Sequence, residues 1–309
     1  MNSPQETKVC VIGLGSMGFG MAESLLRDGF AVTGVDVNSD AMERFEALGG
    51  AVAADPAAGA RDAELVIAVV VNSGQTEEVL FGATGAVAAM SEGGVVMSCA
   101  TMSPDLARAF AARCAELGVE YLDTPISGGA LRAASGELTI MGSGPSSVFA
   151  RIRPALNSIA ATVYELGEEA GTGAAFKVVN QLLAGVHIAA ACEAITFAKA
   201  MDLDLEKVYE VITASAGNSW MFENRVPHVL EGDYSPRSAV DIFTKDLGIV
   251  TDIGRSMKFP TPIAGMALQL FVMTAAAGMG RDDDASVARM LANIAGLDLP
   301  KAASPASEG

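Results

Sequence analysis

The first half of the chain alternates between short apolar runs and segments whose apolar residues have helical spacing. The run from Lys8 to Ile12 is rich in β-branched side chains, Ser16 to Asp28 has apolar residues four apart, and Ala31 to Val35 is again extended. Further strands are predicted at 65–71, 95–99, 119–122 and 138–141, with helices at 76–80 and 104–117. This alternation predicts a doubly wound α/β domain, with a mostly parallel sheet covered by helices on both faces.

The pattern changes at the glycine-rich junction between Leu166 and Gly173. Beyond it no convincing run of strands is present, and helices are predicted at 174–201, 205–214, 238–258, 263–277 and 284–295. We therefore expect an α/β domain over 7–168 and an all-α domain over 169–300, joined by a long helix that begins near Thr172. Residues 1–6 and the tail 301–309 are expected to be disordered.

Charge and cysteine usage narrow the classes of function. The chain has 309 residues and a net charge of -17, which argues against nucleic acid and anionic membranes as partners. The four cysteines are scattered in apolar surroundings, as is typical of buried thiols in a reducing cytoplasm. With two histidines and no clustered ligand spacing, a structural zinc site or a histidine-based triad has little to build on.

Two long apolar segments bear on membranes and partners. Phe259 to Gly280 has no charged side chain and is long enough to span a bilayer, but its prolines and polar residues fit a buried helix better. The helix that starts near Thr172 is apolar nearly all round, as expected for a helix between domains or subunits. We therefore expect a homo-oligomer, a homodimer or homotetramer.

A glycine motif follows the first predicted strand and opens the first helix. Its spacing, Gly13-x-Gly15-x-x-Gly18 around Ser16 and Met17, permits a tight turn and close approach of a pyrophosphate to the helix N-terminus. In this context the motif predicts a Rossmann-type dinucleotide site, whereas an isolated motif of this kind is often a glycine-rich turn.

The residue that ends the second strand indicates which dinucleotide binds. Asp36 can accept hydrogen bonds from the adenosine ribose hydroxyls, and its charge would repel a 2'-phosphate. Val37 and Asn38 offer no arginine to neutralise one, so NAD is favoured over NADP. The alternative is that an aspartate caps the next helix, a role that suits Asn38 or Asp40 better.

Lys177 is the only charged residue between Glu169 and Glu193. Burial of an ammonium without a partner lowers its pKa, which brings a lysine into the range useful for proton transfer. The alternative is a lysine whose stem covers apolar surface while its head reaches water. Asn180 and Gln181 follow at the third and fourth positions, so in a helix the three polar groups share one face.

A second loop could bind an anion. Asp123 to Gly129 reads DTPISGG and follows a strand, and the glycines after Ser127 leave backbone N–H groups available to a carboxylate. Taken alone, this segment could be an ordinary turn.

Together these motifs resemble the β-hydroxyacid dehydrogenase family, which includes 3-hydroxyisobutyrate dehydrogenases and tartronate semialdehyde reductases. The resemblance runs from about Lys8 to Pro300 and rests on VIGLGSMG, DTPISGG, GTGAAFKVVNQLL and FTKDLGIV, in that order. Within the family the chain looks closest to bacterial L-threonate dehydrogenases, through segments such as VVVNSGQTEEVLFG and SAGNSWMFENRVPH. It departs from 3-hydroxyisobutyrate dehydrogenases at Gln181, where those enzymes usually have asparagine, which favours a more hydroxylated substrate.

The resemblance implies a role for each matching residue. Lys177 is similar to the catalytic lysine, and the substrate carboxylate would bind the loop Ser127, Gly128 and Gly129. Asn180 and Gln181 would orient the substrate, and Lys245 is similar to a second lysine near the nicotinamide. The remaining positions resemble those along the cofactor and are Val70, Val71 and Thr101.

Alternatives remain for some of these residues. Lys245 and Asp246 could form a solvated charged turn, and Trp220 and Phe222 could close the pocket or belong to the core or an interface. The resemblance implies NAD-dependent oxidation of L-threonate to 2-dehydro-L-erythronate. A 3-hydroxyisobutyrate dehydrogenase and a tartronate semialdehyde reductase are the enzyme alternatives, and a noncatalytic NAD-binding sensor is the alternative from another class.

Overall fold

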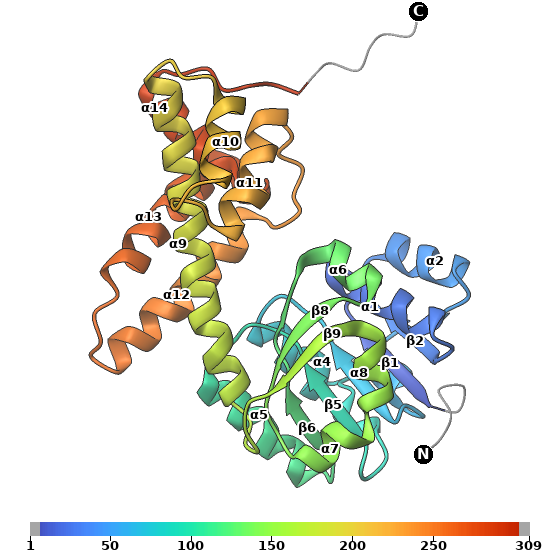
Figure 1. Ribbon diagram of the computed structural model, residues 1–309. Coiled ribbons are helices and arrows are strands. Elements are labelled where there is room, and N and C mark those ends of the chain that lie inside the picture. The colour runs from blue at the N-terminus through green and yellow to red at the C-terminus, as the bar shows by residue number, and fades with distance from the viewer. Residues whose placement is uncertain (1–6, 303–309) are drawn as a thin grey trace, which may run out of the picture. The chain divides into compact units, whose positions relative to one another are not determined.

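The computed structural model describes residues 7–302. The predicted disorder of 1–6, and that of the tail 301–309 beyond Ala302, therefore falls outside the described residues, and Lys301 and Ala302 belong to no helix or strand. Two compact units, Met1–Val178 and Val179–Gly309, make up the chain. The boundary between them lies inside one helix, α9 (Thr172–Ala200), which is drawn in yellow-green in Figure 1.

Six parallel strands form the central sheet of the first unit. They are β1 (Lys8–Ile12), β2 (Ala31–Val35), β3 (Ala51–Val52), β4 (Leu65–Ala68), β5 (Val95–Ser98) and β6 (Glu120–Asp123). Their order in the sheet is β3-β2-β1-β4-β5-β6, which reverses direction between β1 and β4. This is the doubly wound arrangement, and it confirms the predicted fold class.

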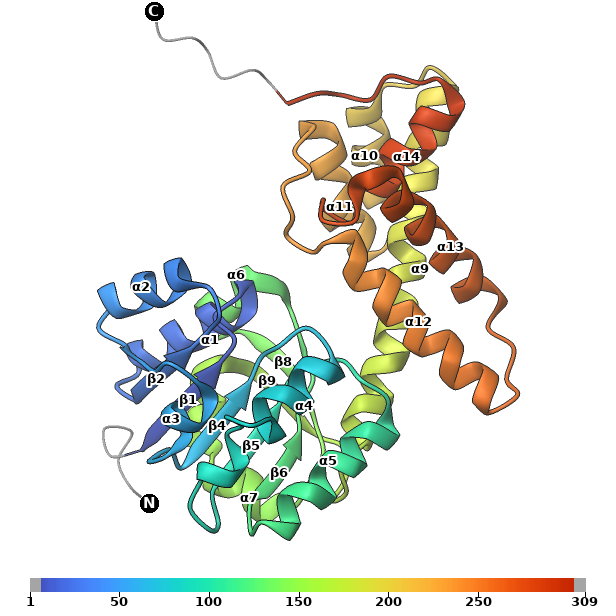
Figure 2. The same cartoon turned by 180° about the vertical axis from the view of Figure 1, so that it is seen from behind.

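Side chains of β1 alternate between two apolar cores because successive residues of a strand point to opposite faces. Val9 and Val11 pack in the core formed with α1 (Ser16–Arg27), α2 (Ser39–Ala47) and α8 (Arg153–Ile159). Cys10 and Ile12 pack in the core formed with α3 (Pro56–Ala60), α4 (Ser73–Phe81), η2 (Val87–Ala89) and α5 (Pro104–Glu116). Figure 2 shows the second group of helices on its side of the sheet.

A second, smaller sheet was not predicted. It contains β7 (Ile126–Ser127), β8 (Leu138–Gly142) and β9 (Ala160–Glu165), with β8 antiparallel to β7 and parallel to β9. Residues 138–141 form a strand as predicted, but this strand does not extend the six-stranded parallel sheet, because its partners are β7 and β9. Within the chain α6 (Gly129–Ser135) separates β7 from β8. A further helix, α7 (Ser146–Arg151), lies between β8 and α8.

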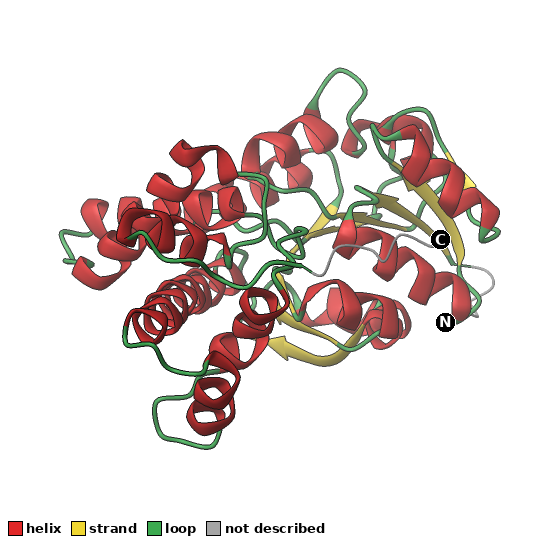
Figure 3. Cartoon of the chain, turned by 90° about the horizontal axis from the view of Figure 1, so that it is seen from above, coloured by secondary structure: helices red, strands yellow, loops and turns green. Residues whose placement is uncertain are grey.

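The second unit is helical, and its described residues contain no strand, as Figure 3 shows by colour. The predicted all-α domain is thus confirmed. Besides most of α9, the unit contains α10 (Leu205–Thr213), α11 (Trp220–Glu231), α12 (Val240–Ser256), α13 (Pro262–Thr274), the π-helical turn η3 (Ala275–Met279) and α14 (Ser286–Ala295).

Two helices are long and apolar enough to cross a membrane by length and composition, α9 and the segment Pro262–Met279. In the second segment only 28% of the most apolar window is buried inside the chain. The prediction of a buried helix is therefore wrong for the isolated chain, and Ile263 and Met266 are largely exposed on it.

Candidate active site

The predicted cofactor residues of the first unit lie where the parallel strands end. Gly13 follows β1, Asp36 follows β2, Val70 follows β4 and Thr101 lies just beyond the end of β5. Because the strands are parallel, these positions share the carboxyl edge of the sheet, where doubly wound folds bind ligands at the point of strand reversal. The loops after β1 and β4 meet there, since a side chain at Gly13 would lie 2.3 Å from the carbonyl oxygen of Val69.

The three glycines of the motif are required for different reasons. Gly13 has φ of 98°, a conformation that favours glycine. A Cβ at Gly18 would lie 1.8 Å from the carbonyl oxygen of Gly13, so close packing of helix on loop excludes any side chain. A Cβ at Gly15 would meet nothing within 4 Å, and Gly15 is the N-cap of α1. Open space at this helix N-terminus fits the approach of a phosphate group.

Asp36 holds the turn between the motif and the next helix. Its Oδ2 accepts a hydrogen bond from the backbone N–H of Leu14 over 2.6 Å, and its Oδ1 accepts one from Asn38 over 2.8 Å. The cap of α2 is Asn38, whose side chain accepts from the N–H of Asp40. Asp36 therefore does not cap α2, and its carboxylate lies beside the glycine motif.

Two other loops at this edge carry predicted cofactor positions. The backbone N–H of Val71 donates to the side chain of Gln75 over 2.9 Å, and Asn72 caps α4. Val71 is exposed, whereas Val70 and Thr101 are half-buried. All three residues thus lie at the same edge of the sheet. Their contact with a cofactor stays a prediction.

Lys177 is buried, with 7% of its surface exposed. Its Nζ donates a hydrogen bond to the carbonyl oxygen of Ile126 over 2.7 Å. Ile126 directly precedes Ser127, so Nζ of Lys177 lies beside the predicted carboxylate loop. Lys177 therefore does not extend into solvent along the surface, which was the alternative to a functional lysine.

The loop after β7 has a backbone that favours glycine. Gly128 has φ of 136° and Gly129 has φ of 80°, and a Cβ at Gly129 would meet nothing within 4 Å. Ser127 pairs with Thr139 of β8, and α6 begins at Gly129. The serine, the turn and the first N–H groups of the helix thus come together within three residues, as an anion site requires.

Asp123, the first residue of the DTPISGG segment, has no predicted role of its own, but it fixes the start of α9. Its Oδ2 accepts hydrogen bonds from the backbone N–H groups of Gly171 and Ala174, over 2.9 and 2.8 Å, and from the hydroxyl of Ser143. The Ser143 hydroxyl in turn accepts one from the N–H of Gly173. Burial raises the pKa of Asp123 to about 6, although these hydrogen bonds and Arg108 lower it.

Polar residues of the second unit form a chain of contacts of their own. Asn180 donates through Nδ2 to Oε1 of Gln181 over 2.9 Å, and Gln181 donates through Nε2 to Oδ2 of Asp246 over 2.5 Å. Nζ of Lys245 lies 2.8 Å from Oδ1 of Asp246. Asp246 is 2% exposed, so a fully solvated charged turn is the wrong description of this pair.

The periodicity of α12 could have revealed the burial of Asp246. It lies three residues after Phe243 and four before Val250, both of which are buried. The aromatic residues considered for the pocket differ, because Phe222 is buried and stacks on Tyr209, whereas Trp220 is half exposed. Phe222 is thus a core residue of its unit.

Other potential sites carry less chemistry. The four cysteines are buried and free, and burial raises the pKa of Cys10, Cys99 and Cys114 to about 12. Across residues 7–302, no group of acidic, histidine or cysteine side chains is arranged to hold a metal ion.

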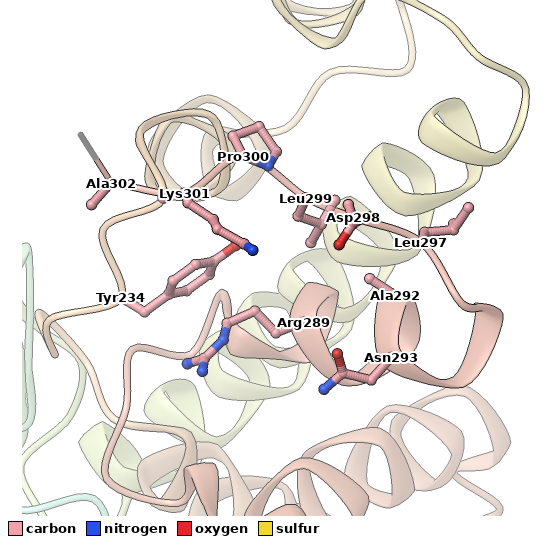
Figure 4. Close-up of a pocket in the computed structure, with 11 residues that line it drawn as sticks. Tyr234, Arg289, Ala292, Asn293, Leu297, Asp298, Leu299, Pro300, Lys301 and Ala302 are labelled. Atoms are coloured by element: carbon pink, nitrogen blue, oxygen red, sulfur yellow. The ribbon is translucent and has the colours of Figure 1, made fainter. Parts of the chain in front are cut away.

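A pocket of about 400 Å³ lies in the second unit and contains none of the predicted site residues. Tyr234, Arg289 and Lys301 are among its lining residues in Figure 4. The guanidinium of Arg289 already pairs with Asp282 over 2.7 Å and stacks on the ring of Tyr234. The guanidinium in this pocket is therefore already paired, and we assign no catalytic role to the pocket.

Comparisons with known proteins agree with this arrangement. The family model of the NAD binding domain of 6-phosphogluconate dehydrogenase matches residues 8–167. That of the NAD-binding domain of NADP-dependent 3-hydroxyisobutyrate dehydrogenase matches 171–291.

Similar proteins cover nearly the whole chain. An L-threonate dehydrogenase of Cupriavidus necator is 51% identical over 94% of this chain and 97% of its own length. One from Pectobacterium atrosepticum is 45% identical over 97% of this chain and 98% of its own length. The crystal structure of a 3-hydroxyisobutyrate dehydrogenase from Salmonella typhimurium is 44% identical, covers 92% of this chain and 100% of its own, and superposes with a TM-score of 0.88.

These matches confirm the resemblance, the Rossmann-type fold and a nicotinamide dinucleotide as cofactor. The glycine motif, its open helix N-terminus and the carboxyl edge around it fit such a cofactor by their own geometry. The chain belongs to the 3-hydroxyisobutyrate dehydrogenase-related family of β-hydroxyacid dehydrogenases, and it is a dehydrogenase that acts on a small hydroxy acid.

Proposed function

We propose that the chain oxidises L-threonate at C2 to 2-dehydro-L-erythronate with NAD. The observation that carries the chemistry is the hydrogen bond from Nζ of Lys177 to Ile126, which places the lysine next to the loop 127–129. The substrate is supported by the L-threonate dehydrogenases that are 43–51% identical over nearly the whole chain.

In the proposed site Ser127, Gly128 and Gly129 bind the substrate carboxylate through the hydroxyl and backbone N–H groups. Lys177 hydrogen-bonds the C2 hydroxyl and accepts its proton as the C–H bond breaks. The bound nicotinamide ring supplies the acceptor for the hydride. A positioned general base contributes about 10²- to 10⁴-fold to the rate, so Lys177 carries a large part of the catalysis.

The glycine motif and Asp36 select NAD in this proposal. Gly15 and Ser16 at the start of α1 face the pyrophosphate, with Met17 and Gly18 behind them, and Asp36 receives the adenosine ribose. The acidic side chain disfavours a 2'-phosphate by charge repulsion, and neither Val37 nor Asn38 offsets it. Val70, Val71, Thr101 and Lys245 are assigned to the cofactor by family resemblance.

The proposal includes a cytoplasmic homodimer or homotetramer with domain limits at 7–168 and 169–300. Exposed apolar residues on α9 and α13 support self-association, among them Val179, Leu183, Ile263 and Met266. Light scattering coupled to size exclusion should therefore give a mass of two or four chains.

A panel of acids tests the reaction. Purified protein should have its highest kcat/KM with L-threonate and NAD, and lower values with NADP, 3-hydroxyisobutyrate and glycerate. Equal or better turnover of 3-hydroxyisobutyrate would select that alternative, which the Salmonella structure also favours. Better turnover of glycerate would select tartronate semialdehyde reductase. Binding of NAD without turnover of any hydroxy acid would indicate the noncatalytic sensor.

A further inference from the structure

Four polar residues of the second unit form one continuous chain of hydrogen bonds and ion pairs. Lys245 contacts Asp246, Asp246 accepts from Gln181, and Gln181 accepts from Asn180. Asp246 and Gln181, the two middle members, are 2% and 8% exposed. Because they are buried, water does not substitute for their partners, and the direction of each hydrogen bond matters.

The charges at one end fix that direction. An ammonium group only donates and a carboxylate only accepts, so Gln181 must turn its Nε2 toward Asp246. Its Oε1 then points to Asn180, which must present Nδ2 to it. The Oδ1 atom of Asn180 remains as the acceptor at the end of the chain.

Asn180 stands close to the proposed general base along α9. It follows Lys177 by three residues, which places both on one face of the helix with a rise of about 4.5 Å between them. In the proposed function the carboxylate of the substrate binds the 127–129 loop and its C2 hydroxyl meets Lys177. We assign the C4 hydroxyl, two carbons beyond the reacting one, to Asn180, which follows Lys177 by about one turn of α9.

We infer that Asp246 is a positioning residue for specificity. It sets the polarity of the two amides so that Oδ1 of Asn180 accepts a hydrogen bond from the terminal hydroxyl of the substrate. Gln181 orients the substrate through Asn180 in this proposal, because the two ends of its amide are held by Asp246 and Asn180. An acceptor at this position binds a hydroxyl group and rejects a carboxylate, which can only accept. This inference rests on the proposed function.

The variant Asp246→Asn should reverse the direction of these hydrogen bonds, and asparagine has almost the same shape as aspartate. Its carbonyl oxygen turns to Lys245, so its amide N–H group faces Gln181 and both amides rotate. Asn180 then presents Nδ2, a donor. The probe is tartrate, in which a carboxylate replaces the terminal CH2OH group of threonate. We expect the ratio of kcat/KM for L-threonate to that for tartrate to fall at least about tenfold.

A second substitution should restore the original polarity. In the double variant Asp246→Asn with Gln181→Glu, the carboxylate introduced at position 181 accepts from the amide introduced at position 246 on one oxygen. It accepts from Asn180 on the other, so Oδ1 of Asn180 is again the free acceptor. We expect the double variant to recover most of the threonate preference. The single variant Gln181→Glu should not keep the threonate preference of the unmodified protein, because its carboxylate faces that of Asp246.

Controls separate this role from a merely structural one. Asp252→Asn removes an exposed carboxylate from the same helix and should leave the ratio unchanged. Gln181→Met removes both hydrogen bonds without adding charge, and it should lower the ratio even if Asp246→Asn fails to fold.

The outcomes distinguish the two levels of the proposal. If the unmodified protein oxidises neither threonate nor another hydroxy acid, the proposed function fails. If it oxidises threonate, two results overturn the role of Asp246 while the function stands. One is a ratio of kcat/KM for threonate to that for tartrate that stays within about twofold of the value of the unmodified protein in Asp246→Asn, or in Gln181→Met if Asp246→Asn does not fold. The other is a double variant whose ratio is no closer to that of the unmodified protein than the ratio of Asp246→Asn is.

Discussion

Oδ2 of Asp123 accepts a hydrogen bond from the backbone N–H of Ala174 over 2.8 Å, and thereby joins the end of β6 to the first turn of α9. Lys177 lies three residues after Ala174 and returns to the same segment through the carbonyl oxygen of Ile126. The helix start and its lysine are thus each tied to residues 123–126. We infer that the position of the lysine head depends on the carboxylate of Asp123.

Replacement of Asp123 by alanine should destabilise the protein and lower its activity. Two buried N–H groups lose their acceptor, which costs roughly 1–3 kcal/mol for each group. Urea unfolding measures the loss, and Asp105→Asn, which alters an exposed carboxylate in the first turn of α5, is the matched control. Equal stability of the alanine variant and the control would show that the cap is dispensable.

The pH dependence of stability should carry the signature of Asp123. Burial raises its pKa from 3.8 to about 6, so the native state holds the proton to a higher pH than the unfolded chain does. Its contribution to stability is greatest below about pH 4 and declines by up to about 3 kcal/mol as the pH rises to about 6. Asp123→Asn lacks this titration. The stability of the unmodified protein relative to this variant should therefore fall between about pH 4 and about pH 7, and a constant difference would contradict the assignment.

Replacement of Lys177 by methionine should lower kcat by about 10²-fold or more while NAD still binds, because the variant keeps the apolar stem and loses the base. Stopped-flow or steady-state turnover gives the rate, and quenching of the Trp220 fluorescence or calorimetry gives the cofactor affinity. Lys199→Met, in the last turn of the same helix, is the control for loss of a lysine charge. Unchanged turnover in the Lys177 variant would refute its role in proton transfer.

The larger elements of the fold could be predicted because their signals are local. The bounds of β1 and β2 follow directly from the apolar runs at Lys8 and Ala31. The two-residue strands β3 and β7 are too short to carry a period, and β9 has only one fully buried residue, Ala160. Helix α11 was missed because it contains Pro227, which normally interrupts a helix.

The residues of the site likewise divide into those with a local signal in the sequence and those without one. Lys177 was detectable as an isolated charge, and the glycine motif as a spacing. The role of Asp246 depends on Gln181, 65 residues away, and that of Asp123 on Ala174, 51 residues away. A single sequence contains no local sign of such pairs, because folding alone brings them together. This is why residues that position the site were found only in the structure.

Alanine at Gly15 and at Gly18 should separate binding from folding. A methyl group at Gly15 meets no protein atom within 4 Å and the backbone φ of -69° is ordinary, so the thermal midpoint should change little. The affinity for NAD should nevertheless fall at least about tenfold, because the methyl group occupies the space of the pyrophosphate. At Gly18 the methyl group would overlap the carbonyl oxygen of Gly13, so the protein itself should be destabilised. Calorimetric titration of folded Gly15→Ala gives the decisive number, and an affinity equal to that of the unmodified protein would place the pyrophosphate elsewhere.

Asparagine at Asp36 should weaken the preference for NAD over NADP. The carboxylate accepts from the backbone N–H groups of Leu14 and Asn38, and asparagine has one acceptor oxygen for these two donors. The affinity for NAD should therefore fall, while the lost charge relieves repulsion of a 2'-phosphate. We expect the ratio of kcat/KM for NAD to that for NADP to drop at least about tenfold, and to drop less at high salt, where charge repulsion is already screened. Asp40→Asn in the first turn of α2 changes the net charge equally and should leave the ratio unaltered. The same ratio in both variants would mean that the selection of NAD does not depend on the position of the Asp36 carboxylate.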